Sequence, residues 1–283
     1  MSIESPILFF ARVRSMQPLI VTAACGQPDT TANVINSVVQ AWRAGAAIAQ
    51  IRAPSTHHPV TGRPQTDLKV WTQLITGIRE KCDILIHAGT AAMQVEDRIE
   101  MLETLHPDTA SFLLGHHALF NRGVERNSLR SRDDSLKLMQ GHIATGVLPE
   151  FEVFHSGSLR NLEFLMSKVA LPRPAVTMFF GWDGGDWSPC SVEEMLHRVR
   201  LLPENALYTI TAAGPEHMLL HALAIARGGH VRGGPGDYAF YRDGVPWRDS
   251  AQFVESAKRL ADEFGREVAT PARAADILGI KRR

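Results

Sequence analysis

Short apolar runs alternate along the chain with longer segments in which apolar residues recur every three or four positions. Runs of the first kind predict β-strands, and spacing of the second kind predicts one buried face of an α-helix. The strands expected from the apolar runs are 19–22, 46–52, 84–86, 110–114, 147–153, 175–180, 206–211 and 230–232. A segment with helical spacing follows each of them, and the last such segment covers 250–264.

Eight alternations of strand and helix predict an α/β protein, a single-domain (β/α)8 TIM barrel, because strands that are buried on both faces read as continuous apolar runs. An open doubly wound sheet is the alternative fold, but no G-x-G-x-x-G follows the first strand to favour it. We expect residues 18–283 to form the barrel and residues 1–17 to form an N-terminal extension. Thr270 followed by Pro271 predicts the start of a short C-terminal helix.

The stretch 228–237, with the sequence GGHVRGGPGD, follows the eighth predicted strand. Its glycines allow the backbone to approach a ligand closely, and Arg232 offers a fixed fork of donors for a carboxylate or phosphate. A tight surface turn is the plain alternative, because glycine and proline collect in turns. The position of the stretch favours a functional loop, since the chemistry of a TIM barrel lies at the C-terminal ends of its strands.

Composition favours a small-molecule partner over nucleic acid or membrane. The chain has 30 basic and 30 acidic residues, so it has no net charge that would attract nucleic acid or anionic lipid. Its three cysteines are far apart and include no C-x-x-C pair, which argues against disulfides or a thiolate zinc site and suits a cytoplasmic protein. The apolar stretch 6–11 is too short to span a membrane and lacks the features of a signal peptide.

Several short motifs, taken together in their order and spacing, resemble the β-keto acid cleavage enzymes, typified by 3-keto-5-aminohexanoate cleavage enzyme. They are TAA at 22–24 with DTT at 29–31, AGA at 44–46, PEFEV at 149–153, GGHVR at 228–232 and ATP at 269–271. The resemblance implies a zinc-dependent (β/α)8 barrel that forms a homo-oligomer, either a dimer or a tetramer. It also implies an activity that converts a β-keto acid and acetyl-CoA into acetoacetate and a new acyl-CoA.

The chain departs from the family at the zinc ligands. The two family histidines on the second strand correspond to Gln50 and Arg52, and the family glutamate ligand corresponds to Gly236. An amide, a guanidinium and a glycine do not replace imidazole and carboxylate as zinc ligands. The resemblance therefore implies that the family zinc site is lost. We expect Arg52 to place its charge where the metal ion would be, with Gln50 adding an amide donor.

The acid and base residues of the family are matched more closely. Asp29 corresponds to a family glutamate, Arg232 to the family arginine and Asp237 to the family aspartate. We expect these three residues to be catalytic, with Arg232 holding a substrate carboxylate and one aspartate acting as base. An ordinary ion pair that closes the barrel mouth is the alternative. Glu152 also matches the family, either as a polar wall of the pocket or as an acid that faces the barrel interior.

His87 stands where the family has a serine, and Ser111 stands where it has a threonine. We expect Ser111 to contact substrate and His87 to act as a general base, although a hydrogen-bonded structural histidine is the alternative for His87. A relocated metal site built from His87, His116 and His155 also stays open, but no metal ligand is assigned.

The CoA end of the site is expected at two glycine-containing loops. Gly181 begins a stretch that keeps the Gly-x-x-Gly-Gly pattern of the family, and Gly214 precedes the seventh helix, where backbone donors suit a phosphate. The family arginine that follows this glycine is replaced by Pro215, which removes one charge from the expected phosphate site.

Two classes of function fit these residues. The first is an enzyme derived from the β-keto acid cleavage family that acts on a small β-keto acid with acetyl-CoA, and loss of the zinc ligands would make it independent of metal. The second is a catalytically altered or inactive barrel that binds a small carboxylate or CoA. Retention of Asp29, Arg232 and Asp237 beside the lost zinc ligands favours the enzyme, because drift after loss of function would be less selective.

Overall fold

The computed structural model describes residues 16–25, 30–53, 56–57, 64–65, 67–90, 93–121, 124–128, 130–181 and 187–281. Within this part of the chain, parallel strands close into an eight-stranded barrel in the order β1-β12-β11-β10-β9-β6-β5-β2. Their bounds are β1 Val21–Ala24, β2 Ile48–Ile51, β5 Leu85–Ala88, β6 Thr109–Leu113, β9 Leu148–Val153, β10 Ala175–Phe180, β11 Leu207–Ala212 and β12 His230–Gly233. The predicted TIM barrel is confirmed, and the open doubly wound sheet is wrong.

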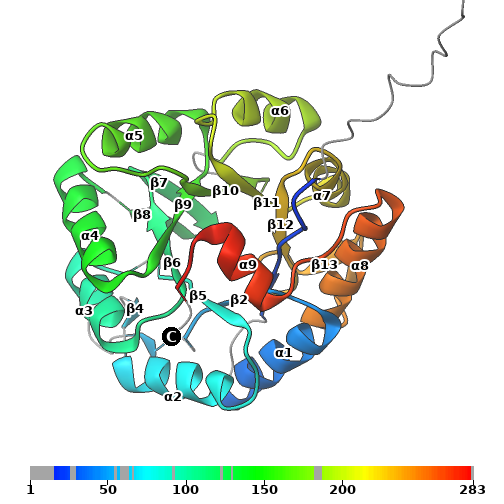
Figure 1. The fold of residues 1–283 in the computed structure, drawn as a ribbon, viewed down its shortest axis with the longest axis horizontal. Coiled ribbons are helices and arrows are strands. Elements are labelled where there is room, and N and C mark those ends of the chain that lie inside the picture. Colours follow the sequence, from blue (N-terminus) through cyan, green and yellow to red (C-terminus); the bar gives the residue numbers. More distant parts are fainter. Residues whose placement is uncertain are drawn as a thin grey trace, which may run out of the picture.

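A helix follows each barrel strand, and the helices form a ring around the barrel (Figure 1). Their bounds are α1 Thr31–Ala44, α2 Leu68–Arg79, α3 Val95–Leu105, α4 Arg132–Thr145, α5 Ser156–Met166, α6 Val192–Arg200, α7 His217–Ala226 and α8 Ser250–Glu263. Several begin at a side-chain cap that accepts a hydrogen bond from the first turn, as Thr30 does for α1 and Ser191 for α6. Among the helices described, none combines the length and the apolar character needed to cross a membrane.

The last helix, α9 (Pro271–Leu278), covers the N-terminal end of the barrel and lies across the middle of the ring in Figure 1. Thr270 caps it and proline follows, as the sequence predicts. Its buried residues belong to one apolar cluster with Ile20, Ile48 and Leu207, which lie at the starts of barrel strands. With this end covered, the C-terminal ends of the strands are left for a site.

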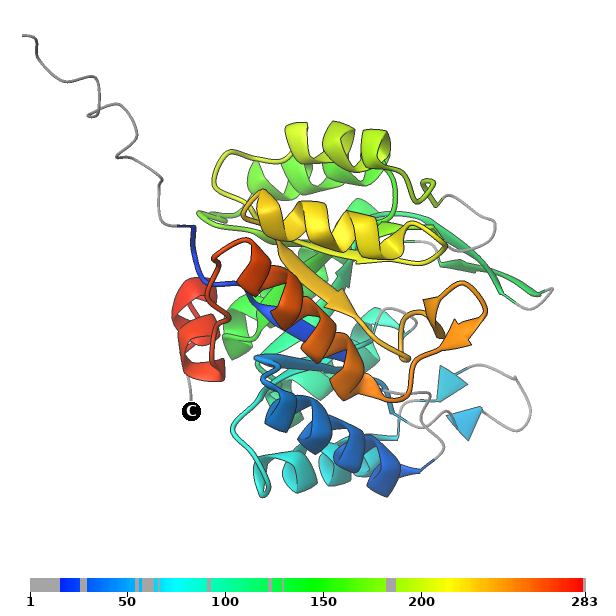
Figure 2. The same ribbon diagram turned by 90° about the vertical axis from the view of Figure 1, so that its right-hand side faces the viewer.

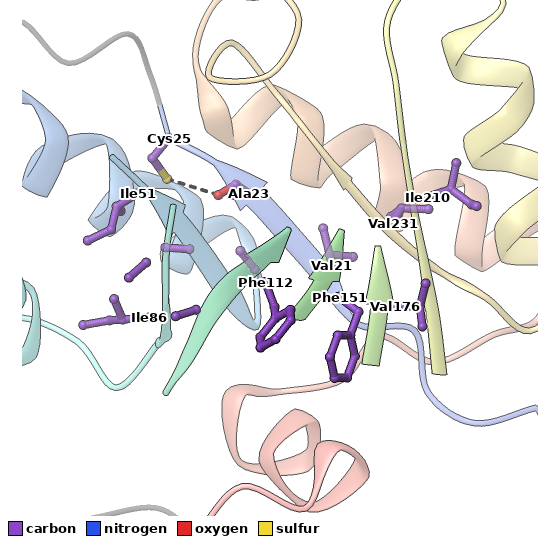
Figure 3. Close-up of a cluster of buried hydrophobic side chains, with 14 of the residues drawn as sticks. Val21, Ala23, Cys25, Ile51, Ile86, Phe112, Phe151, Val176, Ile210 and Val231 are labelled. Carbon is purple, nitrogen blue, oxygen red and sulfur yellow. Dashed lines mark hydrogen bonds between the residues drawn. The ribbon is translucent and has the colours of Figure 1, made fainter. Parts of the chain in front are cut away.

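Residues alternate along each barrel strand between two environments. Side chains that face the helices are apolar and form the main core, as Figure 3 shows for Val21, Ile51, Ile86, Phe112, Phe151, Val176, Ile210 and Val231. The intervening positions face the barrel interior, and many of them are polar and buried: Thr22, Gln50, His87, Ser111, Glu150, Glu152, Thr177 and Arg232. The apolar core therefore lies outside the barrel, while its interior holds polar and charged groups.

In the part of the chain that the structure describes, three two-stranded hairpins lie in segments where the sequence predicts no strand. They are β3 Thr56–His57 with β4 Pro64–Gln65, β7 His117–Asn121 with β8 Val124–Ser128, and β13 Phe240–Arg242 with β14 Val245–Pro246. Each follows a barrel strand, and the hairpins project at the end of the barrel opposite α9 (Figure 2). Their strands are too short or too polar to give a period-two pattern, so periodicity alone does not reveal them.

Candidate active site

The glycine-rich turn after β12 brings Asp237 back over Arg232. Gly234 has φ +117°, a left-handed conformation that favours glycine, and its carbonyl accepts a hydrogen bond from Asp237 N at 3.1 Å. Gly236 N donates to the Ala24 carbonyl at 3.1 Å and so ties the turn to β1. A Cβ on Gly236 would lie 2.9 Å from the Ala24 carbonyl carbon, so a larger residue there requires a backbone shift. The stretch forms a tight turn, and this turn places the carboxylate of Asp237 next to the guanidinium of Arg232.

Arg232 and Asp237 form a buried bidentate ion pair. Nε and Nη2 of Arg232 donate to the two carboxylate oxygens of Asp237 at 2.8 and 2.9 Å. Burial alone would raise the pKa of Asp237, but the charges and hydrogen bonds of Arg232 and Arg52 outweigh this effect and hold the pKa well below its usual range. Asp237 is therefore ionised at neutral pH, and the same contacts make it a weak base.

Arg52 reaches the same carboxylate from just beyond the end of β2. Its Nη2 donates to Oδ1 of Asp237 at 3.1 Å, and its Nη1 donates to the Gly236 carbonyl at 2.7 Å. The Arg52 side chain is 43 % exposed, whereas that of Arg232 is 1 % exposed. One carboxylate thus binds two guanidinium groups, of which only Arg52 reaches solvent to a substantial extent.

Glu150 on β9 is a residue of this cluster that the sequence analysis missed. Its Oε1 accepts hydrogen bonds from Arg232 Nη1 at 3.3 Å and from Thr177 Oγ1 at 2.7 Å, and its Oε2 lies 3.2 Å from His87 Nδ1. Burial alone would raise the pKa of Glu150, but His87 and Arg232 lower it to about 2. Strand alternation was the signal that could have found it, because Glu150 and Glu152 must face the same side of β9.

His87 links Glu150 to a second carboxylate. The ring is fully buried, with Nδ1 2.7 Å from Thr109 Oγ1 and Nε2 3.2 Å from Ser111 Oγ. The Ser111 hydroxyl in turn donates to Oε1 of Glu152 at 2.8 Å. Oε2 of Glu152 and Nε2 of Gln50, which is paired in register with His87, are buried and have no hydrogen-bond partner among the residues that the structure describes. Unsatisfied buried polar atoms of this kind indicate where a ligand or water binds.

The structure therefore brings most of the predicted site residues to one end of the barrel: Gln50, Arg52, His87, Ser111, Glu152, Arg232 and Asp237. Asp29 lies outside the described residues. His116 is exposed and His155 is the N-cap residue of α5. No cluster of three metal-binding side chains occurs among the residues described, so His87, His116 and His155 do not form the relocated site there.

Backbone packing already gives a reason for glycine at the two positions that are predicted to bind CoA. Gly181 and Gly214 have φ values of +77° and +111°. A Cβ on Gly181 would lie 1.8 Å from the Ala213 carbonyl oxygen. The first residue of α7, His217, donates its N–H to the Gly214 carbonyl at 3.2 Å. A role for these glycines in CoA binding stays a prediction, and residues 182–186 of the first loop lie outside the described residues.

Comparison with known proteins assigns the chain to a family. A sequence profile of the β-keto acid cleavage enzymes matches residues 23–280. The chain belongs to the β-keto acid cleavage enzyme family. The resemblance seen in the sequence motifs is thereby confirmed.

Curated relatives of this β-keto acid cleavage family member match over nearly their whole length. The 3-keto-5-aminohexanoate cleavage enzyme of Fusobacterium nucleatum is 29 % identical, over 94 % of this chain and 100 % of its own. The 3,5-dioxohexanoate:acetyl-CoA acetone transferase of Paraburkholderia graminis is 26 % identical, over 90 % of this chain and 89 % of its own. The 3-oxoadipate:acetyl-CoA acetyltransferase of Cupriavidus necator is 24 % identical, over 89 % and 88 %.

Solved structures support the barrel fold of this family member. A ternary complex of ObcA with a C4-CoA adduct and oxalate superposes with a TM-score of 0.69 at 16 % identity, over 89 % of this chain and 67 % of that one. The 3-hexulose-6-phosphate synthase of Salmonella typhimurium superposes with a TM-score of 0.56 at 7 % identity, over 87 % of this chain and 100 % of that one. At such identities the likeness shows the fold alone.

The residues at the family's zinc positions do not fit a zinc ion. The Arg52 guanidinium points at the Gly236 carbonyl and at Asp237, so a cationic side chain stands among the three positions where the family ligands would converge. Gln50 presents an unpartnered Nε2, which is a hydrogen-bond donor. Two donors and a glycine offer no ligand set for zinc, and a guanidinium would repel the ion.

Purified protein is expected to contain no stoichiometric zinc at the end of β2. Elemental analysis checks this, and about one zinc per chain that is lost in Gln50→Ala but kept in His116→Ala would contradict it. The double variant Gln50→His with Arg52→His adds the two family histidines back, and zinc binding by this variant tests the same site. The third family ligand, introduced as Gly236→Glu, is expected to lower stability as well, because its Cβ would lie 2.9 Å from the Ala24 carbonyl carbon.

Replacing Glu150 by glutamine is expected to flatten the acid limb of the stability profile. The pKa of Glu150 is about 2 in the folded protein against an ordinary value of 4.5. Its charge therefore contributes stability that is present above about pH 4.5 and is lost as the pH falls towards 2. Urea unfolding across this range should show a steeper loss for wild type than for Glu150→Gln. Equal slopes would refute the assignment, and Glu163→Gln, at a half-exposed side chain on α5, serves as the control.

Proposed function

We propose that this chain is an acyl-CoA-dependent enzyme that cleaves a carbon–carbon bond of a small β-keto acid. A β-keto acid and acetyl-CoA would give acetoacetate and a new acyl-CoA, a retro-Claisen type of acyl transfer. The observation that carries the proposal is the cluster of Arg52, Asp237 and Arg232 at the barrel mouth of a β-keto acid cleavage family member. The relatives are named for 3-keto-5-aminohexanoate, 3,5-dioxohexanoate and 3-oxoadipate, which supports a 3-keto carboxylate as substrate class.

The proposed reaction makes clear what the site must supply. Loss of a proton from C2 of the β-keto acid gives an enolate, whose charge collects on the keto oxygen. C2 then bonds to the thioester carbon of acetyl-CoA, and the CoA thiolate leaves. Attack of that thiolate on the original keto carbon breaks the bond to C2, releases the new acyl-CoA and leaves acetoacetate after C2 is protonated. The site must therefore provide a cation at the keto oxygen and a group that exchanges a proton with C2.

We assign the cation to Arg52, which makes the proposed mechanism independent of metal. Its side chain is 43 % exposed, so a substrate at the barrel mouth can reach it. Nη1 and Nη2 each keep a second hydrogen besides the one given to Gly236 or Asp237. A keto oxygen can thus accept from Arg52 without breaking the existing contacts. Gln50 adds its unpartnered amide donor to the same site.

Arg232 is proposed to orient the carboxylate of Asp237 and to bind the carboxylate of the substrate. Its Nε, Nη1 and Nη2 each donate to a carboxylate of Asp237 or Glu150. One hydrogen on each Nη is left, which suits a further carboxylate. Asp29, at the position of a family glutamate, remains a proposed catalytic residue.

A binding protein that has lost the reaction is the second candidate. The observation in its favour is that Asp237 and Glu150 are already saturated by buried internal partners, as in a purely structural ion-pair network. Such a protein would hold a carboxylate or acyl-CoA without converting it.

The deciding experiment incubates the protein with acetyl-CoA and each of 3-keto-5-aminohexanoate, 3,5-dioxohexanoate and 3-oxoadipate, with a chelator present. Mass spectrometry then measures acetoacetate and the new acyl-CoA, and reactions without acetyl-CoA are the control. Turnover of any of these acids supports the proposal. A rise in melting temperature with ligand but no turnover supports the binding protein, because a ligand that binds only the folded state stabilises it.

A further inference from the structure

We propose that Glu150, His87, Ser111 and Glu152 form a buried proton relay, and that Oε2 of Glu152 is the atom that exchanges a proton with C2 of the β-keto acid. The inference rests on the proposed function and deepens it. The chain of contacts runs from Glu150 Oε2 to His87 Nδ1 at 3.2 Å, from His87 Nε2 to Ser111 Oγ at 3.2 Å, and from Ser111 Oγ to Glu152 Oε1 at 2.8 Å.

With Glu150 and Glu152 both ionised, the contacts of the relay assign its donors and acceptors, and the Thr109 hydroxyl, 2.7 Å from His87 Nδ1, accepts alongside Glu150. The Ser111 hydroxyl gives its one proton to Glu152, so towards His87 it can only accept. Nε2 of His87 must therefore carry a proton. An ionised Glu150 can also only accept, so a second proton on Nδ1 completes an ion pair between the imidazolium and Glu150. In this state His87 holds a proton and Glu152 is free to take one.

Asp237, Glu150 and Glu152 differ in how far their oxygens are engaged. Both oxygens of Asp237 accept hydrogen bonds from arginine, and both oxygens of Glu150 face donors on other barrel strands. Glu152 accepts at Oε1 only, from Ser111, while its Oε2 is buried without a partner. A proton can bind Oε2 without displacing an existing donor. Glu152 therefore replaces Asp237 as the best-placed base among the residues described.

The relay lets His87 and Glu152 share one proton. In one state His87 is an imidazolium and Glu152 is ionised. In the other, His87 is neutral with its one ring proton on Nδ1, and Glu152 carries a proton on Oε1. The second state becomes the first when Ser111 passes its proton to Nε2 of His87 and gains the proton from Oε1 of Glu152. The number of protons is the same in both states, so His87 and Glu152 act as one coupled unit. The relay can therefore return Glu152 to its ionised form before each proton abstraction.

Charged groups around the relay suit this role. Arg232 from β12 and the buried Arg98 from α3 both act electrostatically with Glu152, so its negative charge is compensated. His142 from α4 faces His87, but burial lowers the pKa of His142 to about 3 and leaves it neutral. His142 therefore does not compete with His87 for the stored proton at neutral pH.

Proton exchange at acetoacetate tests the end of the relay. Acetoacetate is the common product of the proposed reaction, so the probe does not depend on the side chain of the true substrate. Proton NMR in D2O is expected to show that wild-type protein accelerates exchange at C2, and that Glu152→Gln lowers this rate by about 10²–10⁴-fold. Ser111→Ala should also slow exchange, and Ser111→Thr, which keeps a hydroxyl, should exchange faster than Ser111→Ala. Glu163→Gln on α5 is the matched control.

Nitrogen NMR of ¹⁵N-histidine-labelled protein tests the relay without any turnover. The His87 ring signals are identified by their loss in His87→Gln. If the ion pair with Glu150 holds the second ring proton, both ring nitrogens are protonated in wild type, and Nδ1 loses its proton in Glu150→Gln while Nε2–H remains. Glu152→Gln should leave the ring protonated, since an amide oxygen can still accept from Ser111. Melting temperatures confirm that each variant is folded.

The outcomes separate this inference from the proposed function. If the β-keto acids are converted but Glu152→Gln exchanges acetoacetate at the wild-type rate, or wild type does not exchange it, the relay is wrong and the proposed function stands. A His87 ring that is unchanged in Glu150→Gln overturns the relay in the same way. If no β-keto acid is converted, the proposed function fails, and the role of Glu152 in C2 exchange fails with it.

Discussion

Replacing Arg52 by alanine is expected to lower kcat by about two to three orders of magnitude, with a much smaller change in KM. The reason is that a preorganised donor facing a developing oxyanion is worth about this much in rate. Arg52 is the half-exposed cation at the mouth, bonded to the Gly236 carbonyl and to Asp237. Its removal also leaves Asp237 with its bidentate partner Arg232, so the fold should persist. Steady-state kinetics with the best substrate of the panel measures the effect.

Arg248→Ala is the matched control for Arg52→Ala. Arg248 is 62 % exposed and pairs with Asp249 and Glu255, away from the site, so its loss should leave turnover unchanged. If Arg52→Ala keeps wild-type kcat, Arg52 is only a partner of Asp237 and the cation at the keto oxygen lies elsewhere. Arg52→Lys separates charge from geometry, since lysine keeps the charge but cannot reproduce two parallel contacts.

Replacing Arg232 by methionine is expected to lower the free energy of unfolding by about 3–5 kcal/mol, because removing one partner of a buried ion pair leaves an uncompensated charge. The side chain is 1 % exposed and serves two carboxylates, Asp237 and Glu150. Urea denaturation checks the value. Arg160→Met, at a 78 % exposed residue paired with Glu163, is the control and should cost about 1 kcal/mol or less.

Arg232→Lys tests whether turnover requires the guanidinium of Arg232. Lysine keeps the positive charge but loses the fork that holds both oxygens of Asp237, so we expect turnover to be lost while the protein still folds. Unchanged kinetics in Arg232→Lys would make Arg232 a structural residue. A loss of stability in Arg232→Met no larger than in Arg160→Met would instead show that the ion pair contributes little to the fold.

The sequence by itself determined the barrel, because apolar runs and helical spacing are local properties that follow from burial on one or two faces. It therefore placed strands such as 175–180 and the cap Thr270 where the structure has them. It also located Arg232 and Asp237 within one short turn, since their proximity depends only on the chain between them. The hairpins were missed because their short strands are stabilised by backbone pairing and leave little pattern of apolar residues.

Only the tertiary structure decided which charges meet. Arg52 contacts Asp237 across 185 positions in the sequence, and Arg232 contacts Glu150 across 82. Glu150 was assigned no role from the sequence, because alternation places it on the same side of β9 as Glu152 but does not show which side chains of other strands it meets. Closure of the barrel sets Glu150 opposite His87 and Arg232, and this long-range pairing lowers its pKa to about 2 despite burial. Strand order and register, which no local pattern encodes, thus turned separate polar residues into one connected site.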